Sequence, residues 1–183
     1  MSFFQPDARV AWGASSVRAQ APWHDGPVLD LAYALDGRTV CSAGRDGRVR
    51  VWDVAHGELR WEFERAARDL VVSPDGARAW AVSAQGAVWP LDLVRGEEHE
   101  CIWAPRGRVR AGLHTERSVL SPDGRWLLPS CDEGHGGVSV VDVARGTAVT
   151  LVAPGAGELL PVGAFTRDAR AVLLLGGVRM GHT

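Results

Sequence analysis

The feature that most constrains the fold of this chain is an internal repeat. Four segments share a turn signature centred on Asp-Gly or Asp-Ala: ALDGRTV (34–40), SPDGARA (73–79), SPDGRWL (121–127) and TRDARAV (166–172). Successive copies lie 39, 48 and 45 residues apart. Such a period is typical of chains built from stacked units, each of which needs its neighbours to bury its apolar face.

A second signature recurs with a similar period and indicates that the units are made of strands. It reads VWDVAHGEL (51–59), PLDLVRGEE (90–98) and VVDVARGTA (140–148). Both signatures centre on residues of tight hairpin turns, where Gly supplies the positive φ that such turns require. Short β-prone runs flank each turn, and no segment has a convincing helical period. The sequence therefore predicts an all-β protein.

Each complete unit is predicted to hold four short strands. In one of them, Leu59, Trp61 and Phe63 alternate with charged residues, as expected of a strand with one buried face. The predicted strands are 28–35, 39–44, 48–54 and 59–64 in the first unit, 69–73, 78–83, 87–93 and 100–104 in the second, and 117–121, 125–131, 137–143 and 147–153 in the third. A further pair is expected at 161–166 and 170–175.

The first unit resembles the WD-repeat family. It reads WHDGPVLDLAYALDGRTVCSAGRDGRVRVWDVAHGEL over residues 23–59, with a Trp-Asp pair near its end and a His where the family has its Gly-His dipeptide. The resemblance implies β-propeller blades and a buried hydrogen-bond network that is structural rather than catalytic. The residues at the network positions are His24, Ser42, Asp46 and Trp52.

The other units depart from the family pattern. Leu91 and Val141 stand at the Trp position, and Gln85 and His135 stand at the position of the turn Asp. Neither unit has a His at the expected start. We therefore expect these two units to be held by apolar packing alone.

We expect one WD-repeat propeller domain, or a fragment of one, over the 183 residues. It would comprise about three full four-stranded blades and two half-blades. The expected boundaries are 8–23 and 158–183 for the half-blades, and 24–64, 65–104 and 105–153 for the full blades. Three arrangements would cover the bare half-blades: a split or longer propeller, closure by a second copy, or a small ring closed by this chain.

Composition excludes several function classes. The net charge of −2 gives no field that would attract nucleic acid or a membrane surface, and no apolar run is long enough to span a bilayer. Cys41, Cys101 and Cys131 are far apart and have no metal-ligand spacing. We expect a cytoplasmic protein without metal or cofactor.

Catalysis is not expected either. The sequence has no G-x-S-x-G elbow and no phosphate-binding loop, and its six His residues are scattered. The polar segment CDEGHGG (131–137) contains potential metal ligands, but two Gly after His135 would fix them poorly, so we interpret it as an enlarged turn. No catalytic residue is assigned.

The remaining interpretation is a protein–protein interaction scaffold. In a propeller, the loops after strands two and four of each blade lie on one face, and partners could bind there. The alternative is that this face is only a solvated rim of mixed charge, which would include Asp69. Trp23, Trp61 and Trp103 are the expected aromatic anchors. The expected partner-binding rim consists of Trp23, Arg45, Arg65, Arg68, Arg106, Arg108 and Arg110. The alternative function is a regulatory or sensor segment of a larger bacterial signalling protein, linked to a kinase or protease.

Overall fold

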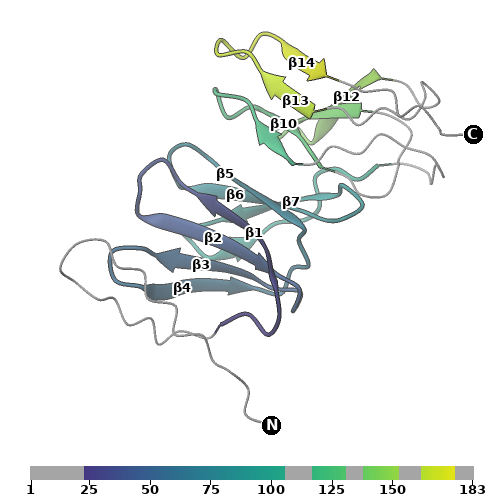
Figure 1. Cartoon of the computed structure of the whole chain (residues 1–183). Coiled ribbons are helices and arrows are strands. Elements are labelled where there is room, and N and C mark those ends of the chain that lie inside the picture. Colours follow the sequence, from purple (N-terminus) through teal and green to yellow (C-terminus); the bar gives the residue numbers. More distant parts are fainter. Residues whose placement is uncertain (1–22, 106–116, 131–137, 153–161, 176–183) are drawn as a thin grey trace, which may run out of the picture.

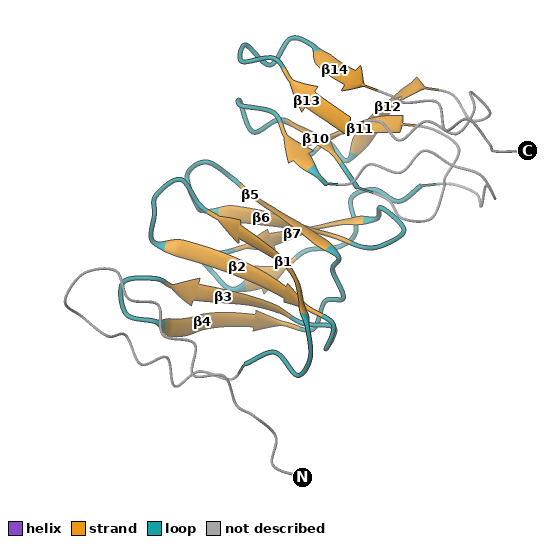
Figure 2. Ribbon diagram, in the orientation of Figure 1, coloured by secondary structure: helices purple, strands orange, loops and turns teal. Residues whose placement is uncertain are grey.

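Every regular element that the structure describes is a β-strand. The computed structural model describes residues 23–105, 117–130, 138–152 and 162–175, and Figure 2 shows them as strands joined by loops. None of these residues forms a helix capable of crossing a membrane. The predicted all-β class is confirmed.

The first blade is a four-stranded antiparallel sheet whose spatial order follows the sequence. Its strands are β1 (Val28–Tyr33), β2 (Thr39–Gly44), β3 (Val49–Asp53) and β4 (Glu58–Phe63). Hairpin turns join neighbouring strands, so the sheet is a simple meander. These bounds fall within two residues of the strands predicted from the sequence.

The second blade repeats this meander with a much shorter last strand. It consists of β5 (Asp69–Val72), β6 (Arg78–Val82), β7 (Val88–Asp92) and β8 (Glu97–Glu98). The β4–β5 connection and the β6–β7 turn lie at the same end of the two sheets, because the strands alternate in direction (Figure 1).

The predicted outer strand at 100–104 is wrong for the second blade. The chain does run beside β7, because His99 donates a backbone hydrogen bond to Pro90 at 3.0 Å and Val88 donates one to Trp103 at 2.8 Å. Only one isolated bridge forms there, between Val88 and Trp103. Pro90 has no N–H to donate, so the regular ladder is interrupted at its position.

The third blade and a final pair of strands complete the described fold. The third blade contains β9 (Val119–Leu120), β10 (Trp126–Leu128), β11 (Val138–Asp142) and β12 (Thr147–Val152), again in meander order.

The last sheet has two described strands, β13 (Val162–Phe165) and β14 (Val172–Leu175). It lies at the opposite end of the described structure from the first blade (Figure 1). The half-blade expected at 8–23 falls outside the described residues except for Trp23, so the three alternatives for closure stay predictions.

Apolar packing holds successive sheets together in three separate cores. The partner faces are filled mainly by small and β-branched residues, which suit closely stacked sheets. The core between the first and second blades includes Cys41, Ala43, Val49, Val51, Phe63, Leu70, Ala81 and Leu91. The next includes Val71, Trp80, Val82, Val88, Leu127 and Val141, and the last includes Leu128, Val138, Val140, Phe165 and Leu174.

The expectation that the second and third units rely on apolar packing alone is wrong. In the third blade, the Ser118 hydroxyl donates to Ser130 Oγ at 3.2 Å and accepts from the Ser130 backbone N–H at 2.9 Å. The carboxylate of Asp142, which is 1% exposed, accepts from Arg125 at 3.1 Å. Between the first and second blades, the Leu70 N–H donates to Asp30 at 2.8 Å. Comparison with the first blade could not reveal these contacts, because they are made by residues other than those that align with His24, Ser42, Asp46 and Trp52.

The first turn of each unit is fixed by its Asp. This carboxylate accepts a hydrogen bond from the backbone N–H two residues ahead, the usual Asx-turn arrangement. The distances are 2.8 Å for Asp36, 3.0 Å for Asp75, 3.1 Å for Asp123 and 3.2 Å for Asp168. The next residue adopts positive φ, and in the fourth unit this residue is Ala169, with φ of 57°.

Replacing Ala169 with Gly should stabilise the last sheet. A residue with a Cβ costs roughly 1–2 kcal/mol in the left-handed region, and Gly avoids this cost. Part of the benefit is lost, because a chain with Gly has more conformational entropy in the unfolded state. We expect Ala169→Gly to raise the free energy of unfolding by about 0.5–1 kcal/mol in urea denaturation. The control is Ala144→Gly in the β11–β12 turn, where φ is not positive; equal gains at both positions would contradict the explanation.

Candidate functional site

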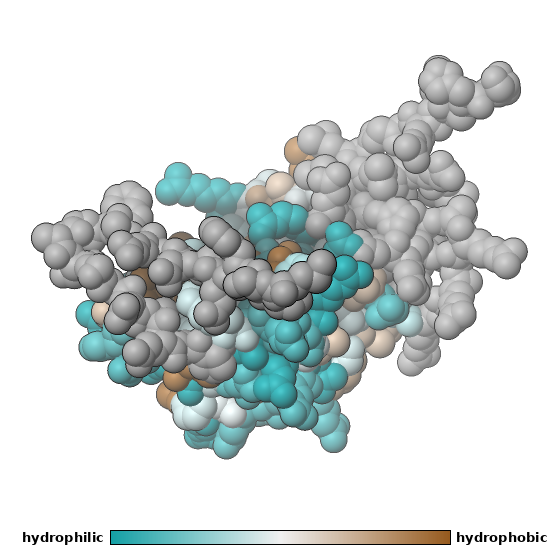
Figure 3. All heavy atoms as spheres, turned by 60° about the horizontal axis from the view of Figure 1, so that its bottom comes forward, coloured by the Kyte–Doolittle hydropathy of each residue, from teal (hydrophilic) through white to brown (hydrophobic). Residues whose placement is uncertain are grey.

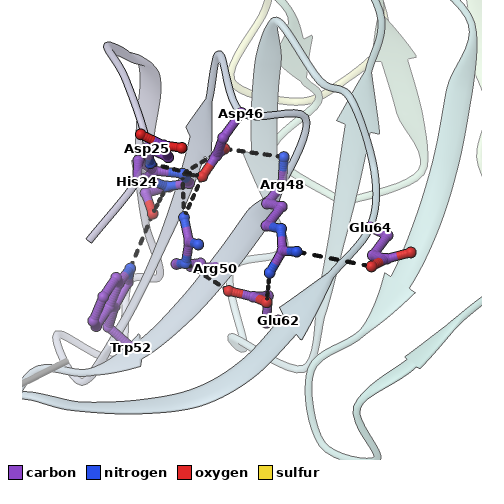
Figure 4. Close-up of polar contacts among 9 residues, drawn as sticks. His24, Asp25, Asp46, Arg48, Arg50, Trp52, Glu62 and Glu64 are labelled. Carbon is purple, nitrogen blue, oxygen red and sulfur yellow. Dashed lines mark hydrogen bonds and ion pairs between the residues drawn. The ribbon is translucent and has the colours of Figure 1, made fainter. Parts of the chain in front are cut away.

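A buried polar network lies at the loop end of the first blade (Figure 4). The indole N–H of Trp52 donates to Ser42 Oγ at 2.9 Å, and Ser42 Oγ lies 2.8 Å from Nε2 of His24. Nδ1 of His24 lies 2.9 Å from Oδ1 of Asp46. The structure thus brings together all four residues at the expected network positions.

The network ties the segment before β1 to the turn between β2 and β3. The Asp46 carboxylate accepts hydrogen bonds from the backbone N–H groups of Asp25 at 3.1 Å and Arg48 at 3.2 Å. Gly44 is required for this close approach, because a Cβ at that residue would lie 2.0 Å from Nδ1 of His24. The loop segment is therefore held by both side-chain and backbone contacts.

Arg50 is a fifth member that the sequence analysis did not assign. Its side chain is 4% exposed, and its Nη1 lies 2.8 Å from Oδ2 of Asp46 and 2.5 Å from Nδ1 of His24. Nε of Arg50 lies 2.7 Å from Oε2 of Glu62 on β4, which also pairs with Arg48. The available signal was strand alternation, which places Arg50 on the same face of β3 as Trp52.

The charges of the network are balanced around Asp46. Burial opposes ionisation of this carboxyl, but hydrogen bonds from Arg50, from His24 and from the backbone outweigh burial and hold its pKa well below the ordinary value. Asp46 is therefore a carboxylate at neutral pH and neutralises the buried guanidinium of Arg50. A buried charge of either sign would be costly without the other.

The arrangement is suited to holding loops rather than to chemistry. Both ring nitrogens of His24 already face partners, and the Ser42 hydroxyl lies between the indole and the imidazole. Both side chains are buried, with 4% of the His24 side chain and 3% of Ser42 exposed, so neither is open to an incoming substrate or metal ion. Satisfied polar networks of this kind make a local structure rigid.

Removing the charge of Asp46 should destabilise the first blade. Asp46→Asn would remove the buried counter-ion of Arg50 and leave it only the partly exposed Glu62. Breaking a buried pair costs about 3–5 kcal/mol, and we expect a loss near the lower end of that range because Glu62 remains. Because the pKa of Asp46 is depressed, its contribution is present above about pH 4 and is lost as pH falls through the lower folded value.

Urea denaturation at pH 7 and in acid tests this prediction. Glu64→Gln is the matched control, since Glu64 is 89% exposed. The free-energy deficit of Asp46→Asn should shrink in acid while the control stays near wild type throughout. A loss of less than 1 kcal/mol at pH 7 would mean that Asp46 is not a main support of the blade.

The expected rim residues have different environments. Trp23 is 55% exposed, and Arg45 is also exposed, with its backbone N–H donating to Pro27 at 2.9 Å. Arg68 is half-buried, and its backbone N–H donates to Val82 at 2.8 Å. Three other expected members lie outside the described residues: Arg106, Arg108 and Arg110.

Arg65 connects two blades instead of facing solvent freely. Its guanidinium carbon lies 4.6 Å from the ring centroid of Trp89, and its Nε pairs with Glu98 of β8. Both contacts attach the β4–β5 connection to the second blade. The cation–π geometry and the ion pair together leave Arg65 less available for a partner.

Two of the expected aromatic anchors are not exposed, and this expectation is corrected. Trp61 packs against the first core, and its indole N–H donates to the carbonyl of Leu93 at 2.9 Å. Trp103 packs against the second core. Asp69, expected on the charged rim, is 5% exposed. In each case a neighbouring blade covers a residue that looks peripheral in its own unit.

Figure 3 turns the bottom of the view in Figure 1 toward the reader. The described surface on this side is mainly hydrophilic, with hydrophobic residues in small, separated areas. The outermost strand of the first blade contributes to this character, because Glu58, Arg60 and Glu62 alternate along β4. The apolar exposure of the first blade is concentrated on β1, where Val28, Leu29, Leu31 and Tyr33 are 49%, 47%, 53% and 66% exposed.

The chain is similar to a known family of repeat proteins and to several of its members. Residues 17–53 match the family model "WD domain, G-beta repeat". The human WD repeat-containing protein 90 is 30% identical over 85% of this chain and 9% of its own length. The LST8 homolog of Drosophila pseudoobscura pseudoobscura is 30% identical over 59% of this chain and 34% of its own length.

A third relative extends the likeness to plants. The WD repeat-containing protein 26 homolog of Arabidopsis thaliana is 25% identical over 66% of this chain and 20% of its own length. The chain thus spans between 9% and 34% of the length of these three relatives.

Proposed function

Because the chain belongs to the WD-repeat family, we propose that it is a non-catalytic scaffold that binds a partner protein through the loop rim of its first blade. The observation that carries the proposal is the attachment of exposed Trp23 to the adjacent network residue His24. Trp is among the residues that contribute most to binding at protein interfaces, and a fixed anchor loses little entropy on binding.

The rim beside Trp23 adds charge to this anchor. Asp25 and Arg45 are both exposed, and backbone hydrogen bonds tie their segments together, from Asp25 to Asp46 and from Arg45 to Pro27. The rim therefore offers an exposed aromatic ring, a guanidinium and a carboxylate on a backbone held by hydrogen bonds. Such a surface suits a partner with an apolar pocket beside an acidic residue.

The non-catalytic part of the proposal is supported by the burial of the network residues and by the family to which the chain belongs. Ser42, the hydroxyl beside His24, is 3% exposed and accepts a hydrogen bond from the Trp52 indole, so the pair is buried away from an incoming substrate. A cytoplasmic location belongs to the same proposal and rests on composition. The alternative of a bacterial signalling segment has no observation in its favour among the described residues or the three relatives.

We also propose that a further polypeptide segment covers the outer part of the third blade. Val140 faces the β13–β14 sheet, and Val149 is its register partner on β12. Val149 and Leu151 remain 54% and 41% exposed, whereas Trp61 of the first blade is covered by the second. Two outer strands beside β14 would bury them, supplied by a longer or split propeller or by a second copy.

Quantitative affinity capture from cells of the source organism tests the rim. The double variant Trp23→Ala with Arg45→Glu should lose partner capture by about 30-fold, the effect of removing one strong anchor. Arg95→Glu is the matched control, because Arg95 is exposed in the turn after β7, at the other end of the blades.

Circular dichroism should show that both variants remain folded. Partners lost by the double variant and retained by the control would support the proposal. An unchanged set of partners in the double variant would contradict the placement of the binding surface on this rim.

A further inference from the structure

Three charged residues occupy the same position in successive repeats. Asp30, Asp69 and Arg117 each precede the first residue of their turn signature by four residues. This position lies at the innermost strand of each blade, on β1, at the start of β5 and just before β9. The strands β1 and β5 are in contact, and hydrogen bonds from Arg117 and Ser118 reach the two carboxyl groups, so the three repeat positions meet at one seam.

Hydrogen bonds at this seam join all three blades. Oδ2 of Asp30 and Oδ1 of Asp69 both accept from the backbone N–H of Leu70, at 2.8 Å and 3.1 Å. Oδ2 of Asp69 accepts from the backbone N–H of Ser118, and Arg117 donates to Oδ1 of Asp30 at 2.9 Å. The first and third blades thus meet through the two carboxyl groups.

Two carboxyl groups that share one N–H donor are electrostatically unfavourable when both are ionised. A proton on Asp69 turns that group into a donor toward Asp30, and repulsion becomes attraction. Burial, followed by the proximity of Asp30, raises the pKa of Asp69 to about 6, and hydrogen bonding to Ser118 opposes this rise. The other carboxyl of the pair, Asp30, accepts from Arg117 through Oδ1.

The other charged residues in the described surroundings of the pair are arginines. The strand β2, which also packs on β5, has no charged residue, and Arg78 is exposed at the beginning of β6. Arg68, next to Asp69 in sequence, is half-buried. Arg117 faces the pair but its side chain is 71% exposed, so water screens its charge.

We propose that Asp30 and Asp69 share one proton and form a pH-sensitive joint between the first three blades. With the proton in place, the inner strands are linked through Leu70 and Ser118. When the proton leaves to water, two negative charges face each other between β1 and β5, and the seam loosens. The joint would make blade-to-blade contact weaker in alkaline than in mildly acidic solution.

The sign of the effect follows from the raised pKa. The folded chain binds this proton more tightly than the unfolded chain does, since the value moves from 3.8 to about 6. The stabilisation is therefore complete below about pH 4 and is lost as pH rises through 6. For this single group, the unfolding equilibrium constant should increase about 100-fold across that window.

A pair of variants isolates the joint from the other carboxyls. Asp69→Asn keeps a donor toward Asp30 and an acceptor for Ser118 at every pH. The ratio of the wild-type unfolding constant to that of Asp69→Asn should rise about 100-fold between pH 4 and pH 7 in urea denaturation. The ratio of wild type to the control Asp25→Asn, at an exposed carboxyl, should stay level.

A second measurement does not depend on the folding of a variant. Carbon NMR of the Asp carboxyl groups in the wild-type chain should show one group with a midpoint near pH 6, and this midpoint should move down in Asp30→Asn. A ratio that does not change with pH, or carboxyl groups that all titrate below pH 5, would overturn the proposal.

Discussion

Each sheet in this protein has two faces that only another sheet can cover, and the rest of the structure depends on this constraint. The face of the first blade that carries Cys41, Val49 and Val51 is buried because the second blade packs on it, and the same relation links the second blade to the third. Where the neighbouring sheet has only two described strands, Val149 and Leu151 stay exposed. Stability and the exposed surface are thus properties of neighbouring pairs of blades rather than of single blades.

Polar groups act within this apolar frame in two different ways. In the first blade, the network around Asp46 fixes the loop that carries Trp23, so it links a buried charge balance to the proposed binding rim. At the inner strands, the carboxyl groups of Asp30 and Asp69 link different blades. The first arrangement positions a loop and the second positions whole sheets, although both use carboxylates that accept backbone N–H groups.

The repeat was sufficient to predict the blades because turn signatures and strand alternation are local properties. It also identified the positions of His24, Ser42, Asp46 and Trp52, which the structure places in mutual contact. Contacts between repeats were not predictable in this way. The partial covering of Trp61, the burial of Asp69 and the pairing of Arg65 with Trp89 depend on how one sheet is offset from the next, and no local pattern records that offset.

Pro90 has a consequence for how this molecule meets other molecules. By interrupting the ladder beside β7, it leaves the outer side of the second blade with a two-residue strand of glutamates followed by an irregular run. Such a margin is a poor template for the growth of intermolecular sheets. The margin of the third blade is different, because β12 is six residues long and carries no charge. The protein thus has one outer margin protected against self-association through strands and another that invites it.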